Sequence, residues 1–162
     1  LAGDPDWFEA WNNLGSRRLQ MGRYAESEEA FRRAAAIDAN NAMVQSNLGL
    51  ALLFVRDAAG AEEAARKSLL VEPGSDRAKY VAGMALLQQN KRAEEALEWL
   101  REAAKAMPRA LLATAEWNCR HNDFAGCETD LRAFLKTPRG PNHEAAEKWL
   151  SEVRKVRNTE ER

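Results

Sequence analysis

The stretch AWNNLG, residues Ala10–Gly15, decides the fold because it recurs along the chain. It places a glycine inside an apparent helix, where glycine costs about 1 kcal/mol relative to alanine. Related stretches follow at a constant spacing of 34 residues: QSNLG (Gln45–Gly49) and YVAG (Tyr80–Gly83). A constant period of this length predicts a repeat architecture.

Each unit has the pattern of a helix, a short turn and a second antiparallel helix. In the first unit, two apolar stripes have helical spacing; their members are Trp11, Leu14 and Met21, then Ala30, Phe31, Ala34 and Ile37. The second helix of each unit ends at a comparable stop. These stops are Asp38-Ala39, Glu72-Pro73 and Met107-Pro108, spaced by 34 and 35 residues.

The recurring glycines are explained by small residues at a matching place in the second helix. The expected facing pairs are Gly15 with Ser27, Gly49 with Ala61, and Gly83 with Ala96. Two helices approach closely only where the side chains on both are minimal. We therefore predict a tight contact between the helices of each unit.

The pattern resembles the tetratricopeptide repeat, W-x2-L-G-x2-Y followed by A-x3-F and P over 34 residues. The first unit carries Trp11-x2-Leu14-Gly15 and Ser27-x3-Phe31, with Ala39 in place of the proline. The resemblance implies an all-α, right-handed α-solenoid of stacked antiparallel helix pairs with a C-terminal capping helix. The expected segments are the tail of a preceding repeat (1–7), repeats 1 to 3 (8–41, 42–75, 76–108), a divergent repeat 4 (109–138) and the cap (140–158).

Composition excludes several classes of function. The 162 residues are 45% hydrophobic, which suffices for one domain with a core. The net charge of −1 gives the chain no overall positive field that would attract nucleic acid. The sequence contains no run of 18 apolar residues, so it predicts no membrane-spanning segment. No cofactor motif for phosphate binding is present. The compartment stays open, with the cytoplasm favoured.

The cysteines and histidines offer little catalytic chemistry. His121 and His143 have no serine or cysteine partner at a recognisable spacing, so we expect no hydrolytic enzyme. Cys119, His121 and Cys127 match no standard zinc spacing. We expect Cys127 to be a packed small residue and Cys119 a partly buried thiol, with a metal-binding protein as the less favoured alternative.

What remains is the surface of the first helices, which lines a concave groove in a stacked helical array. We predict that this groove binds a protein or peptide, with asparagines contacting its backbone and apolar residues accepting its side chains. The predicted groove residues are Asn12, Ser16, Met43, Asn47, Leu50, Phe54, Arg77, Tyr80, Val81 and Met84.

One subtype of the family binds a C-terminal carboxylate through a five-residue clamp. The corresponding positions here are Asn12, Ser16, Asn47, Arg77 and Val81. Only Asn47 matches, with Arg77 preserving charge, so the clamp is disfavoured. The favoured function is a non-enzymatic protein-interaction module. One alternative is an architectural or self-associating segment, which could form a homo-oligomer. The other is the metal-binding protein.

Overall fold

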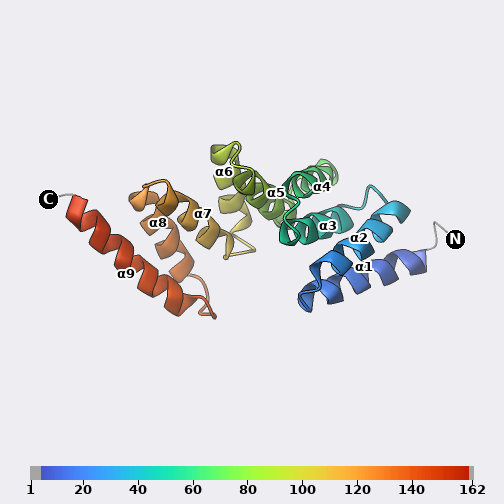
Figure 1. Ribbon diagram of the computed structural model, residues 1–162, viewed down its shortest axis with the longest axis horizontal. Helices are drawn as coiled ribbons and strands as arrows, with labels where there is room; N and C mark the ends of the chain where they lie inside the picture. The colour runs from blue at the N-terminus through green and yellow to red at the C-terminus, as the bar shows by residue number, and fades with distance from the viewer. Residues whose placement is uncertain (1–4, 161–162) are drawn as a thin grey trace.

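The computed structural model describes residues 5–160, and within that range it contains nine α-helices and no strands (Figure 1). The helices are α1 (Pro5–Gln20), α2 (Tyr24–Ile37), α3 (Ala42–Phe54), α4 (Ala58–Val71), α5 (Asp76–Gln88), α6 (Ala93–Ala103), α7 (Ala110–Arg120), α8 (Phe124–Leu135) and α9 (His143–Glu160). The prediction of an all-α solenoid of helix pairs is confirmed.

Each helix packs against the next one along the chain, and α1, α3, α5 and α7 also contact one another in sequence. Figure 1 shows the result as an arch, with α1 and α2 at one end, α5 and α6 at the top and α9 at the other end. The first helices of the pairs form the layer that faces the inside of this arch. That layer positions the candidate site.

The turn inside each helix pair has a residue with left-handed backbone at an equivalent position, and the third turn has a second one, Arg92. The equivalent residues are Gly22, Arg56, Asn90 and Asn122, spaced by 34, 34 and 32 residues. The following amide donates to a carbonyl five residues back, as Asp57 N does to Leu52 O at 3.0 Å. This pattern closes the C-terminus of a helix and favours glycine or asparagine. Arg56 is therefore an unusual occupant of its turn.

The recurring glycines do permit close approach, but the largest neighbours differ from those predicted. A Cβ on Gly15 would lie 2.7 Å from the ring of Phe31, and a Cβ on Gly83 would lie 2.7 Å from Leu100 and 2.8 Å from the Ala96 carbonyl oxygen. Ser27 Oγ donates to Gly15 O at 2.8 Å. The small facing residues are thus present, while the glycines chiefly make room for a large apolar side chain.

The interior consists of two separate apolar clusters. The first is formed by α2 to α5 around Phe31, Leu52 and Val81. The second joins α7 and α8 to α9, where Leu150 and Val153 pack with Leu131 and Phe134. Helix α9 thereby covers the apolar side of α8, and its outward residues are charged or exposed.

A buried carboxylate also ties α9 to α8. Glu128 is 3% exposed, and its oxygens accept from Arg154 Nε at 2.9 Å and Arg157 at 2.6 Å, with Arg132 at 2.8 Å. The hydrogen bond from Arg154 and the charges of the three arginines outweigh burial and hold the pKa of Glu128 below its ordinary value. No feature of the repeat pattern indicates this ion-pair cluster.

The first element begins earlier than predicted. Helix α1 starts at Pro5, so residues 5–7, expected in the tail of a preceding helix, belong to the first helix. Residues 1–4 lie outside the described residues. Trp7 on this added turn is 51% exposed.

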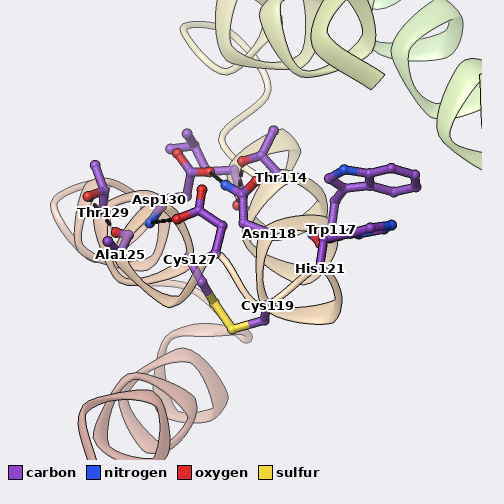
Figure 2. The surroundings of a disulfide bond; sticks show 12 residues. Thr114, Trp117, Asn118, Cys119, His121, Ala125, Cys127, Thr129 and Asp130 are labelled. Carbon is purple, nitrogen blue, oxygen red and sulfur yellow. Dashed lines mark hydrogen bonds between the residues drawn. A yellow bond between two sulfur atoms is a disulfide. The ribbon is translucent and has the colours of Figure 1, made fainter. Parts of the chain in front are cut away.

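A disulfide joins α7 to α8, which corrects the expectation of two thiols (Figure 2). Cys119 and Cys127 have their Cα atoms 5.3 Å apart. The two residues lie symmetrically about Asp123 in the turn, so antiparallel packing brings them opposite each other. Above them, Asn118 Nδ2 donates to the buried carboxylate of Asp130 at 2.9 Å. Covalent and polar contacts thus fix the fourth hairpin.

Replacing Gly83 with alanine should destabilise the fold, although alanine is the better helix former. The added methyl meets the Ala96 carbonyl oxygen, which belongs to a helix backbone and cannot move cheaply. We expect a loss of about 1–3 kcal/mol in the free energy of unfolding, measured by urea denaturation. Gly74→Ala is the control, since no atom lies within 4 Å of its added Cβ. Equal stability of the Gly83 variant and wild type would contradict the tight contact.

The lowered pKa of Glu128 predicts a pH-dependent stability. The ionised carboxylate stabilises the folded chain above the pKa of the unfolded state, and this contribution is lost as the pH falls through the folded-state pKa. Glu128→Gln should therefore cost about 1–3 kcal/mol near pH 7, with the difference from wild type shrinking in acid. Glu144→Gln, an exposed change on α9, should stay within about 0.5 kcal/mol. A pH-independent deficit would argue against the ion-pair explanation.

Reducing the Cys119–Cys127 bond should lower stability by about 2–3 kcal/mol, because a short closed loop is released in the unfolded chain. The measurement is a denaturation curve with and without reductant, with thiol content checked by mass spectrometry. The Cys119→Ala, Cys127→Ala double variant should not respond to reductant. Identical curves for the oxidised and reduced wild type would show that the bond contributes nothing to stability.

Candidate binding groove

A hollow opens between the C-terminal ends of α3 and α5, on the layer of first helices. Its volume is about 380 Å³. It is lined mainly by apolar and aromatic side chains, and its residues are Tyr24, Leu50, Leu53, Phe54, Arg56, Tyr80, Met84 and Gln88. We call it the aromatic hollow. It brings together four of the predicted groove residues, namely Leu50, Phe54, Tyr80 and Met84.

Two neighbouring hollows continue the same surface toward α9. The second hollow, about 370 Å³, shares Arg56, Met84 and Gln88 with the aromatic hollow and adds Trp117 from α7. A third, about 340 Å³, shares Glu116 with the second and reaches α9. Because neighbouring hollows share residues, the three together form one interrupted groove, which runs from the turn between α1 and α2 to helix α9.

The aromatic wall depends on a contact between two repeats. The rings of Tyr24 and Phe54 stack with their centroids 4.4 Å apart and an interplanar angle of 6°. Phe54 nevertheless keeps 46% of its surface exposed and Tyr24 36%. Tyr24 begins α2 directly after the first turn, and Phe54 ends α3 directly before the second. A flat, accessible aromatic surface results, and such surfaces bind apolar groups well.

The predicted asparagines lie together but bind each other. Asn47 Nδ2 donates to Asn12 Oδ1 at 3.1 Å, and Arg77 donates to Asn47 Oδ1. Asn12 is 9% exposed and Asn47 is 4% exposed. These contacts link α1, α3 and α5 within the layer of first helices. The polar row therefore links three repeats, and its hydrogen bonds engage both polar atoms of Asn47 and the Oδ1 atom of Asn12.

Three other predicted groove residues lie outside the hollows. Val81 is fully buried and packs on Gly49, so its place on the groove surface is wrong. The cause is that Gly49 lacks a side chain, and Val81 fills the space. Met43 is 51% exposed at the start of α3 and lines none of the three hollows. Ser16 is half-buried on α1 and also lies apart from them.

Sequence reasoning missed three residues that line the hollows. Tyr24 and Arg56 lie at turns, outside the first helices to which the prediction was confined, and Trp117 lies on α7 in the divergent fourth repeat. The sequence did contain one signal: position 56 is an arginine, whereas the equivalent positions of the other turns are glycine or asparagine.

The cysteine and histidine residues do not converge on a reactive site. The two sulfur atoms are bonded to each other, and Figure 2 shows the rings of Trp117 and His121 stacked away from the disulfide. His143 Nδ1 accepts from Gly140 N at 3.0 Å while Nε2 lies 3.1 Å from Thr137 O. Within residues 5–160, no cluster of three or more histidine, cysteine or acidic residues is arranged to hold a metal ion.

None of the helices in the described part of the chain combines the length and the apolar content needed to cross a bilayer.

Solved structures with the same architecture are numerous, although their sequences are distant. pilF of Pseudomonas aeruginosa superposes with a TM-score of 0.77 at 21% identity, covering 94% of this chain and 70% of that one. MamA protein gives 0.69 at 14% identity, covering 94% and 88%. The first tetratricopeptide domain of Spaghetti (RPAP3), solved with the HSP90 peptide SRMEEVD, gives 0.63 at 18% identity, covering 77% and 98%. These likenesses show the fold.

Family membership comes from the sequence. No curated protein shows a significant sequence match to the chain. Two family models, both described as tetratricopeptide repeat, match residues 8–41 and residues 46–110, which together exceed half of the chain. Repeats of this family are protein–protein interaction modules. The chain belongs to the tetratricopeptide repeat family.

Proposed function

We propose that the chain is a non-enzymatic module that binds a peptide or protein segment along its concave groove, with an apolar side chain of the partner in the aromatic hollow. The observation that supports this proposal most directly is the hollow itself. It has about 380 Å³ of space between two repeats and walls from Leu50, Phe54, Tyr80 and Met84. Concave, mostly apolar sites with a few polar groups are typical of binding sites.

The polar residues around the hollow favour an extended partner segment that inserts one apolar side chain, rather than a partner whose contact surface is apolar throughout. Gln88 and Arg56 lie at the edge of the hollow, and both are exposed. Met84 is half-buried and has a flexible thioether, which adapts to different apolar groups. We assign backbone contacts to this polar edge, because Asn12 and Asn47 are buried and hydrogen-bonded within the protein.

Tyr80→Ala should weaken partner binding by about 1–3 kcal/mol, because it removes an aromatic wall of the aromatic hollow. The ligands are peptides selected from a displayed random 12-residue library on the wild-type chain, and their affinities are measured by calorimetry. Phe54→Ala is a second test, since the exposed ring contributes little to the core. Arg32→Ala, on the outer face and paired with Glu28, is the control and should leave affinity unchanged.

Selected peptides that bind all variants equally would contradict the proposed site. Analytical ultracentrifugation of the wild type tests the alternative of self-association. A dimer that dissociates on Tyr80→Ala substitution would assign the aromatic hollow to a second copy of the chain.

A further inference from the structure

Several arginines on the outer side of the solenoid are paired with carboxylates. Arg32 and Arg33 bind glutamates one helical turn away, and Arg66 lies 2.9 Å from Glu62 and 3.1 Å from Glu95. Arg92 bridges the same two glutamates. These arginines therefore have little free charge to offer to a partner.

Arg56 differs from them in charge environment. Among the residues whose side chains the structure describes, no carboxylate lies within ion-pair distance of its guanidinium, and its own side chain is exposed. It lines both the aromatic hollow and the second hollow, so it stands at their junction. The only other cation lining these two hollows, Arg120, is neutralised by Glu116 at 2.5 Å.

A second arginine adds positive charge beside the aromatic hollow. The guanidinium of Arg109 lies 4.6 Å from the centroid of the Tyr80 ring, and this arginine likewise has no carboxylate partner among the described residues. The aromatic hollow itself has no acidic lining residue. The apolar site is thus bordered by two arginines that form no ion pair with a described carboxylate.

Arg56 also occupies its position at a conformational cost. Its φ is +68°, in the left-handed region, where equivalent turns carry Gly22, Asn90 and Asn122. A residue with a Cβ is disfavoured there, and glycine or asparagine would remove most of the penalty. Arg92, the other arginine with a positive φ, makes two ion pairs. An unpaired arginine at a left-handed turn position points to a use outside the chain.

We infer that the groove selects partners in which an acidic side chain lies a few residues from the apolar anchor, and that Arg56 binds that carboxylate. The inference rests on the proposed function of the aromatic hollow and adds the chemical class of its partner. It uses a turn residue rather than positions inside the first helices. The acidic group is that of a peptide side chain, because the neighbouring apolar hollow requires a side-chain anchor on the same ligand.

The probe is a panel of nine-residue peptides with acetylated N-termini and amidated C-termini. Each has a central leucine, phenylalanine or methionine and carries glutamate, glutamine or lysine at one position within four residues of that anchor. Binding to the full chain is measured by fluorescence polarisation at two salt concentrations. The best glutamate peptide should bind about two- to fivefold more tightly than its glutamine counterpart, and less so at high salt.

Arg56→Gln should abolish this preference, so that glutamate and glutamine peptides bind the variant with equal affinity. Arg139→Gln is the matched control: it removes an exposed arginine that has no carboxylate partner in the described chain and lies outside the hollows. Arg139→Gln should keep the preference. Arg56→Asn should lose the preference and show a higher denaturation midpoint, because asparagine tolerates the left-handed turn.

The outcomes separate the two proposals. A glutamate preference that is absent in wild type, or that persists in Arg56→Gln, overturns the role of Arg56, while weaker binding by Tyr80→Ala would still support the hollow. If no peptide binds the wild type better than it binds Tyr80→Ala, the proposed function itself fails. Preference of Arg56→Glu for lysine peptides would support the charge pairing directly.

Discussion

The close approach of the two helices in each repeat is the contact on which the other features depend. At Gly83 the absent side chain leaves space for Leu100 and for the Ala96 carbonyl oxygen of the partner helix. At Gly49 the same kind of space is taken by Val81 from the following repeat. One small residue therefore serves packing both within a repeat and between repeats. Because the spacing is constant, these contacts add to form a stack with a continuous inner layer of first helices.

The inner layer has two parts with different chemistry. In one part, Asn12, Asn47 and Arg77 join three repeats through hydrogen bonds, and both asparagines are buried. In the other part, the aromatic hollow lies open between Phe54 and Tyr80. Polar residues thus link the repeats, and apolar residues provide the accessible surface.

The repeat period was enough to predict the helix pairs and four lining residues of the aromatic hollow, because helical spacing determines which side of a helix faces the groove. Val81 was misplaced since its burial depends on the missing side chain of Gly49, a contact between repeats. The bond between Cys119 and Cys127 followed from their symmetry about the turn, which spacing rules for metal sites do not consider. Arg56 was missed because turn residues have no helical periodicity. Pairing of Glu128 with three arginines depends on how α9 lies on α8, which the period does not describe.

The two apolar clusters give the arch an internal border between α6 and α7. The first cluster takes its residues from α2 to α5, and the second takes them from α7 to α9, with no residue in common. Across this border the two clusters are joined by the packing of α6 on α7 and by the second hollow, which takes Met84 from α5 and Trp117 from α7. A partner bound in the second hollow would therefore touch residues on both sides of the border.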